Sequence, residues 1–103
     1  MNEKIVCVSG YFDPIHIGHL EYFKFSKKLG TKLMVIVNND EQAILKKGKP
    51  FMPCEERIKI INEFKCVDYV VKSIDKDRTV CETLRTVEPK PHFFCNGGDQ
   101  NNN

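Results

Sequence analysis

The segment Gly-Tyr-Phe-Asp-Pro-Ile-His-Ile-Gly-His at positions 10–19 constrains the fold of this chain more than any other feature. It follows the apolar run 5–9, which is typical of a buried strand, and precedes a segment with helical spacing. At such a junction, unpaired backbone N–H groups and the positive end of the helix dipole favour binding of a phosphate. We therefore expect His16 and His19 to bind the phosphates of a nucleotide.

The rest of the chain alternates between apolar runs of strand type and segments of helical spacing. Helices are expected at 19–29 with Gly30 as a left-handed stop, from 38–40 to about Lys46, from Pro53 to Phe64, and at 79–87; strands are expected at 33–37, 67–71 and 92–95. Strands that alternate with helices favour right-handed βαβ crossovers and a parallel sheet. We predict one α/β domain over residues 1–103, a Rossmann-like parallel sheet of about four to five strands with helices on both faces.

The predicted topology brings distant segments of the chain to one edge. In open parallel sheets, ligands bind beyond the carboxyl ends of the strands. Segments 10–19, 38–49 and 96–99 each follow a predicted strand. We therefore expect them to form one site.

Composition excludes several classes of protein. The chain has 103 residues, 41% of them hydrophobic, which suits a single compact core, and its net charge of +2 is too small to indicate a nucleic-acid-binding protein. The five cysteines are an odd number without a Cys-x-x-Cys pair, which favours a reduced, cytoplasmic protein. The longest strictly apolar run, Leu33 to Val37, is far too short to span a bilayer, so no membrane association is expected.

The glycine pattern differs from the better-known phosphate loops. The chain has neither a Gly-x-x-x-x-Gly-Lys-Ser/Thr loop nor a Gly-x-Gly-x-x-Gly sequence in the first crossover. It has instead His16-Ile17-Gly18-His19. The missing side chain of Gly18 lets a ligand approach the backbone, and the flanking imidazoles can donate to phosphate oxygens from two sides.

These motifs, in their order and spacing, closely resemble those of the cytidylyltransferase-like nucleotidyltransferases. The resemblance rests on the segment 10–19, Lys46 in a Leu-Lys-Lys-Gly loop, Glu-Glu-Arg-Ile at 55–58, Val-Asp at 67–68 and Asn-Gly-Gly-Asp at 96–99. It covers nearly the whole chain. The chain looks most like the branch that contains glycerol-3-phosphate cytidylyltransferase and the adenylyltransferase half of the bacterial heptose-synthesis enzyme.

The resemblance implies an enzyme in which a substrate phosphate attacks the α-phosphorus of a nucleoside triphosphate and releases pyrophosphate. It implies catalytic roles for His16, His19 and Lys46, which would bind the phosphates and stabilise the developing charge. Nucleotide-binding roles are implied for Gly10, Tyr11, Phe12, Asp13, Gly18, Arg57, Gly97, Gly98 and Asp99.

Several of these residues also have a purely structural interpretation. Lys46 could belong to a solvated charged loop with Lys47 and Lys49, and Arg57 could pair with Glu56 or Glu63. Gly97 and Gly98 could form a turn after a strand. The aromatic residues Tyr22, Phe23, Phe25 and Phe64 are interpreted as core or subunit contacts rather than as a platform for a base.

The resemblance also implies substrates and partners. CTP is the preferred nucleotide, ATP the alternative, and the acceptor a small phosphorylated sugar or alcohol. Mg²⁺ would bind mainly through the triphosphate, because the sequence shows no dedicated protein metal site, with Asp13 the weakest of candidates. Relatives are often dimers, so a homodimer is expected.

The chain departs from the family pattern at its carboxyl end. Relatives continue beyond the Gly-Gly-Asp segment with a further helix, a strand and a Ser/Thr-rich turn, whereas this sequence ends at Asn103. A truncated nucleotidyltransferase domain is therefore expected. The alternative is a non-catalytic nucleotide-binding or assembly domain.

Overall fold

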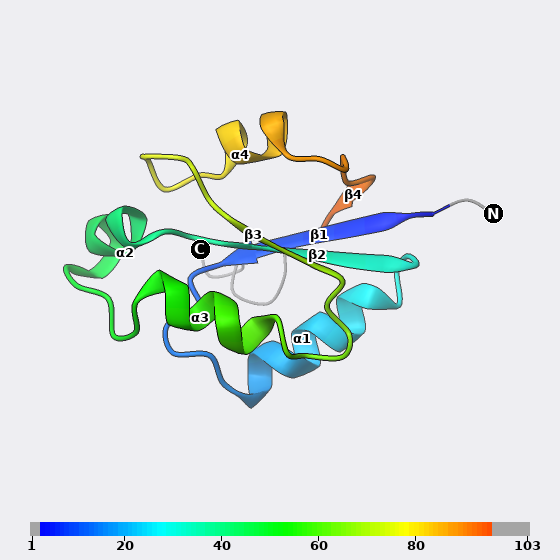
Figure 1. Cartoon of the computed structure of the whole chain (residues 1–103), viewed down its shortest axis with the longest axis horizontal. Helices are drawn as coiled ribbons and strands as arrows, with labels where there is room; N and C mark the ends of the chain where they lie inside the picture. Colours follow the sequence, from blue (N-terminus) through cyan, green and yellow to red (C-terminus); the bar gives the residue numbers. More distant parts are fainter. Residues whose placement is uncertain (1–2, 96–103) are drawn as a thin grey trace.

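The computed structural model of the chain describes residues 3–95 and shows one parallel sheet with helices on both faces (Figure 1). In chain order, its elements are β1 (Ile5–Gly10), α1 (Ile17–Lys27), β2 (Lys32–Val37), α2 (Asp40–Lys47), α3 (Cys54–Ile61), β3 (Tyr69–Lys72), α4 (Cys81–Thr86) and β4 (Phe93–Phe94). The strand order is β3-β2-β1-β4, and every pairing is parallel. The predicted fold class is therefore confirmed.

Strands β1 and β2 form the centre of the sheet and are buried on both faces. Their register places Val6 beside Leu33 and Val8 beside Val35. Because successive side chains of a strand point to opposite faces, a continuous apolar run supplies two cores at once. One core contains Val6, Val8, Leu33, Val35 and Val37, and the other contains Ile5, Cys7, Met34 and Ile36.

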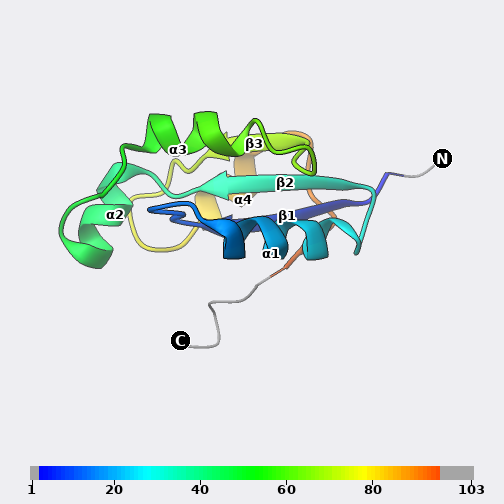
Figure 2. The same ribbon diagram turned by 90° about the horizontal axis from the view of Figure 1, so that it is seen from below.

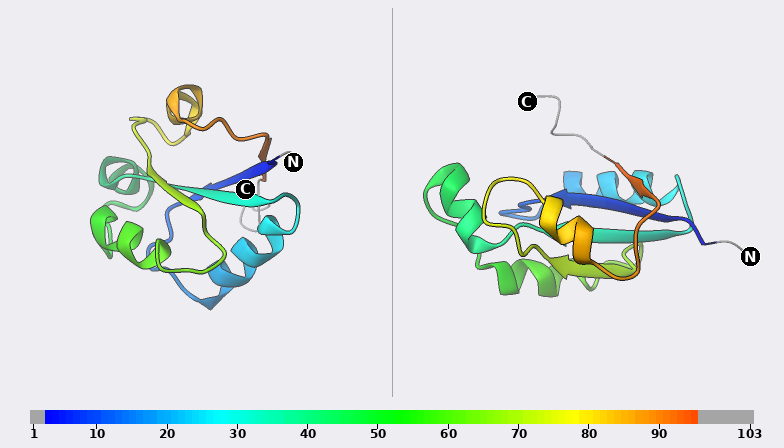
Figure 3. Two further views of the ribbon diagram at one scale, coloured as in Figure 1. Left: turned by 45° about the vertical axis from the view of Figure 1, so that its right-hand side comes forward. Right: turned by 90° about the horizontal axis from the view of Figure 1, so that it is seen from above.

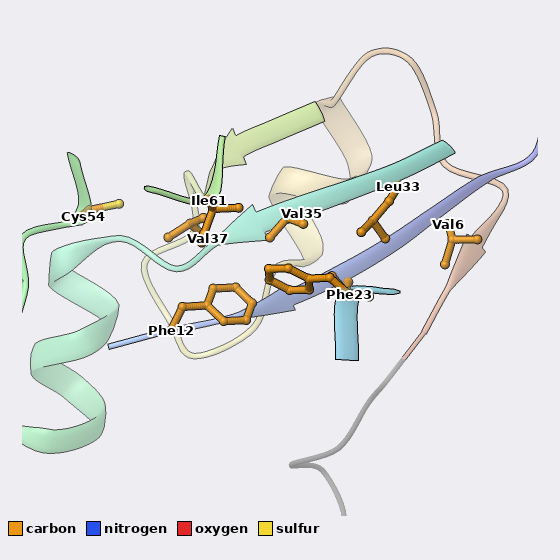
Figure 4. Close-up of a cluster of buried hydrophobic side chains, with 9 residues drawn as sticks. Val6, Phe12, Phe23, Leu33, Val35, Val37, Cys54 and Ile61 are labelled. Carbon is orange, nitrogen blue, oxygen red and sulfur yellow. The ribbon is translucent and has the colours of Figure 1, made fainter. Parts of the chain in front are cut away.

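The helices cover these two faces separately. Phe23 of α1 and Ile61 of α3 pack on the first core, where Figure 4 shows them beside the valines of β2. Val80 and Val87, which flank α4, pack on the second. Figures 2 and 3 show α1 and α3 on one side of the sheet and α4 on the other. The short helix α2 lies beyond the carboxyl ends of the strands (Figure 1).

Several element boundaries differ from their predictions: α3 ends at Ile61 rather than at Phe64, and α4 spans Cys81–Thr86 rather than 79–87. At two further boundaries, side chains take the place of backbone hydrogen-bond partners. Helix α1 begins at Ile17 rather than at His19, since the His16 side chain accepts a hydrogen bond from the Gly18 N–H and caps the helix. Strand β3 begins at Tyr69 rather than at Val67, since the Asp68 carboxylate accepts the Leu33 N–H at 2.8 Å in place of a backbone carbonyl.

Gly30 follows α1 as predicted, but the expected left-handed conformation was wrong. Within the described part of the chain, Gly48 is the glycine with a positive φ, at 91°. A Cβ at Gly30 would lie 2.4 Å from the Lys4 carbonyl oxygen and 2.7 Å from Val6 Cγ2. Glycine is required there because the turn passes directly against β1.

None of the helices within residues 3–95 is long and apolar enough to cross a bilayer.

Candidate active site

A cavity of about 470 Å³ opens where the carboxyl end of β1 meets the amino terminus of α1. This is the edge at which parallel α/β sheets bind ligands. The cavity is lined by Ser9, Gly10, Tyr11, Phe12, Asp13, Pro14, His16, Gly18, His19, Tyr22 and Lys46. The structure thus brings the predicted histidines and the predicted lysine to one hollow, although they lie up to 30 positions apart (46 − 16).

The two histidines form a stacked pair at the start of α1. Their ring centroids are 4.0 Å apart, and the ring planes are inclined by 32°. The Nδ1 atom of His16 accepts the Gly18 N–H at 3.0 Å, and the Nδ1 atom of His19 accepts the His16 N–H at 3.1 Å. Each imidazole therefore satisfies one of the N–H groups that a helix start leaves without an intrahelical partner.

These two hydrogen bonds determine where the neutral rings carry their protons. A nitrogen that accepts an N–H bond has no proton of its own, so in the neutral form of each ring the proton is on Nε2. Both imidazoles in the cavity wall are thus arranged as Nε2–H donors. A pair of such donors suits an anion with several oxygens, such as a phosphate.

Gly18 is required because of the His16 ring. A Cβ at this position would lie 2.8 Å from Cε1 and 3.1 Å from Nδ1 of His16. We expected the missing side chain to let a ligand approach the backbone; the structure shows that the His16 ring occupies this space.

Phe12 anchors the loop between β1 and α1. It has a positive φ of 52°, which is uncommon for a residue with a side chain, and its ring is 5% exposed. The ring makes edge contacts with His19 and Phe23, with centroids 5.0 and 5.2 Å apart. Figure 4 shows the rings of Phe12 and Phe23 side by side. A Cβ at Gly10 would lie 2.8 Å from this ring. Gly10 and Phe12 therefore fix the loop on the core, and the Phe12 ring packs against His19.

Asp13 connects this loop to the segment before α3. Its carboxylate accepts the N–H groups of Phe51 and Met52 at 2.7 and 2.6 Å. These two hydrogen bonds hold the backbone of the segment before α3 against the loop. Within residues 3–95, no three His, Cys, Asp or Glu side chains come together in a group that could hold a metal ion.

Lys46 lies on the last turn of α2, opposite the histidine loop. Its side chain is exposed, and its Nζ atom lies 4.5 Å from the centroid of the Tyr11 ring. This distance is within the range of a cation–π contact. The ammonium group is thus at the mouth of the cavity.

The prediction that Arg57 reaches the phosphates is corrected by the structure. Its side chain is fully buried and does not line the cavity. The guanidinium donates to the carbonyls of Met52 (2.9 Å), Tyr11 (2.6 Å) and Asn38 (2.9 Å) and to the Asp40 carboxylate (2.7 Å). A buried guanidinium needs such partners because its desolvation is costly. Arg57 therefore joins the loops that carry the site instead of contacting a ligand.

Three lining residues were not among the predicted site residues: Ser9, Pro14 and Tyr22. Tyr22 follows His19 by three positions on α1, and residues with this spacing share a helix face, so the sequence contained a signal for it. Its hydroxyl donates to the Cys95 carbonyl at 2.9 Å. Conversely, the predicted residues Gly97, Gly98 and Asp99 lie outside the described part of the chain.

An open parallel sheet with a cavity at this edge defines the class of Rossmann-like α/β domains, which bind nucleotides at the carboxyl ends of their strands. Residues 7–103 match the family described as Cytidylyltransferase-like. The chain therefore belongs to this family of nucleotidyltransferases.

Individual relatives agree with this assignment. The chain is 41% identical to the Bifunctional protein HldE of Blochmanniella floridana and 36% identical to that of Citrobacter koseri, over 98% and 94% of its own length. It spans 21% and 20% of these two proteins, or about a fifth of their length. The lipopolysaccharide core biosynthesis protein of Thermoplasma volcanium has a similar structure, with a TM-score of 0.85 and 32% identity. That alignment covers 96% of this chain and 78% of the other.

Proposed function

We propose that the chain transfers a nucleoside monophosphate from a magnesium-bound nucleoside triphosphate to a small phosphorylated sugar or alcohol. The observation that carries the proposal is the pair of imidazoles 4.0 Å apart at the start of α1, in a cavity that Lys46 also lines. Membership of the nucleotidyltransferase family supports the same reaction class.

The proposed reaction is an in-line displacement at the α-phosphorus. An oxygen of the acceptor phosphate forms a bond to this phosphorus, and the bond to the bridging oxygen between the α- and β-phosphates breaks. The electron pair leaves with that oxygen, and pyrophosphate is released. No proton needs to be removed from an ionised phosphate, so positioning and charge stabilisation are the main requirements.

The residues of the cavity suit these requirements. In the proposed reaction, the Nε2–H groups of His16 and His19 donate to phosphate oxygens, where negative charge increases as the bond breaks. The amino terminus of α1 adds the positive end of an 11-residue helix dipole. Lys46 would neutralise the α-phosphate and the incoming acceptor phosphate. Mg²⁺ enters with the triphosphate as part of the substrate.

Both CTP and ATP are candidate donors. The family resemblance prefers CTP and gives ATP as the alternative. The two relatives compared above are both named Bifunctional protein HldE, a name that does not single out CTP, so ATP is tested beside it. A phosphorylated sugar is the first acceptor to test, because the similar structure from Thermoplasma volcanium is named for lipopolysaccharide core biosynthesis.

The test is a panel of CTP, ATP, GTP and UTP against phosphorylated sugars, polyols and amino-alcohols, with pyrophosphate release as the measurement. We expect turnover with CTP or ATP and its loss in His16→Ala. His92→Ala is the matched control, because His92 is the third histidine of the chain and lies outside the cavity. Binding of a nucleotide without turnover would support the non-catalytic alternative, and the absence of both would overturn the proposal.

A further inference from the structure

The helix that carries Lys46 is fixed at its start and exposed at its end. Asn39 and Gln42 exchange hydrogen bonds between their side chains and backbone N–H groups at 2.8 and 3.0 Å, and Gln42 is fully buried. Ile44 and Leu45, in contrast, are 52% and 57% exposed. Because the side chains beside Lys46 in this last turn are exposed, the packing of α2 does not fix the position of the Lys46 ammonium.

Tyr11 is held much more firmly than Lys46. It directly follows β1, and its carbonyl accepts a hydrogen bond from the buried Arg57 at 2.6 Å. Its ring lies 4.5 Å from Lys46 Nζ. No carboxylate pairs with Lys46 in the part of the chain between residues 3 and 95, so the Tyr11 ring is the contact that locates the ammonium.

We propose that Tyr11 is a positioning residue whose ring holds Lys46 at the mouth of the cavity, ready for a phosphate. The inference rests on the proposed function and extends it, since it assigns to Tyr11 an action through Lys46 rather than on the nucleotide itself. The contact is reversible, because a cation–π contact at an exposed site is weak compared with a charge-assisted hydrogen bond to phosphate. Lys46 can therefore leave the ring when the triphosphate enters.

The phenolic hydroxyl has no part in this role. The hydroxyl oxygen of Tyr11 is buried and makes no hydrogen bond to any of the described residues. The face of the ring carries the attraction for a cation, and phenylalanine has a similar face. The ring and the hydroxyl can thus be separated by substitution.

The test is a double-mutant cycle on the affinity for Mg-ATP and Mg-CTP, measured by calorimetric titration of the full chain. Tyr11→Leu keeps an apolar side chain but removes the ring, and we expect it to weaken binding about two- to fivefold. Tyr11→Phe is the matched control and should bind like the wild type. In a Lys46→Ala background, Tyr11→Leu should have no further effect, because its action passes through Lys46. Thermal unfolding of each variant checks that it is folded.

Each outcome decides the inference. If Tyr11→Leu weakened nucleotide binding as much in the Lys46→Ala background as in the wild type, Tyr11 would act on the nucleotide directly, and the inference would be overturned. Equal losses in Tyr11→Phe and Tyr11→Leu would assign the role to the hydroxyl and also overturn it. If the wild type bound neither nucleotide, the proposed function itself would fail, and the inference with it.

Discussion

Residues of the cavity wall depend on one another because their side chains are in close contact. Gly18 and His16 are the clearest pair, since the space of a Cβ at Gly18 is occupied by the His16 ring at 2.8 Å. His16 also uses its Nδ1 atom to cap α1 at the Gly18 N–H. A change at Gly18 therefore acts on His16.

The substitution Gly18→Ala is expected to act in opposite directions in two backgrounds. In the wild type it displaces the His16 ring and breaks the cap, at a cost of about 1 kcal/mol, and it weakens nucleotide binding. In His16→Ala the ring is absent, and the greater helix propensity of alanine should stabilise the chain by up to about 1 kcal/mol. Urea unfolding of the four proteins measures both effects, and a destabilisation of equal size in both backgrounds would contradict the prediction.

Arg57 is a buried polar residue whose removal is expected to cost stability. Arg57→Met removes a donor from three carbonyls and from the Asp40 carboxylate, which is 44% exposed and can turn to water. The cost therefore comes mainly from the carbonyls, and a buried acceptor left without its donor costs about 1–3 kcal/mol. Lys59→Met, an exposed position on the same helix, is the control and should change stability by less than about 0.5 kcal/mol. Urea unfolding followed by circular dichroism compares them; similar midpoints for the two variants would refute the role assigned to Arg57.

Among the elements, helix α4 is capped by a side chain that lies several residues before the helix begins. Asp75 lies five positions before the residue that precedes the helix, yet its carboxylate accepts the N–H groups of Glu82 and Thr83 at 2.8 and 2.9 Å. Burial raises the pKa of Asp75, but the hydrogen bonds from Thr83 and Glu82 together lower it further, so the net pKa is below its ordinary value.

A lowered pKa means that the folded state favours the carboxylate. The stability from this cap is therefore complete above the unfolded pKa of an aspartate, about 4, and is lost as the pH falls through the lower folded pKa. Asp75→Asn is expected to destabilise the chain by about 1–2 kcal/mol at pH 7 and to flatten the loss of stability in acid. The measurement is urea unfolding at intervals of about one pH unit from about pH 2 to about pH 7, a range that includes the ordinary pKa of aspartate. Glu88→Gln, at an exposed position, is the control. If the stability of Asp75→Asn fell in acid as that of the wild type does, the cap would not be the source of this loss.

At the scale of the whole molecule, the cysteines report how tightly the sheet is packed. Cys7 lies on the central strand β1 with no exposed surface, and burial raises its pKa to about 12. Cys81, at the start of α4, is exposed. Since the thiolate is the reactive form, the two thiols should differ strongly in reactivity.

We expect a thiol reagent at neutral pH to modify Cys81 rapidly in the folded chain and Cys7 only when the sheet opens. Mass spectrometry of labelled peptides over increasing urea measures both rates, and labelling of Cys7 should follow global unfolding. Cys81→Ser removes the rapid phase and serves as the control. Comparable labelling rates for Cys7 and Cys81 without urea would mean that the central sheet opens locally.

The fold was largely predictable because its signals are local. The apolar runs 5–9 and 33–37 indicated buried parallel strands, which the structure shows as Ile5–Gly10 and Lys32–Val37, and the alternation with helices indicated the topology. The predicted edge of the sheet then placed His16, His19 and Lys46 together, and the structure does bring them to one cavity.

What the sequence alone determined is thus the order of strands and helices along the chain, the edge that carries the cavity, and the meeting of His16, His19 and Lys46 there. Only the tertiary structure decided how individual groups are used: Arg57 as a buried tie, Gly30 as a close contact with β1, and Asp75 as a distant helix cap. The physical reason is the range of the interactions. Periodicity acts between neighbours in the sequence, whereas the cost of burying a charge or adding a Cβ depends on partners that only the folded chain brings near.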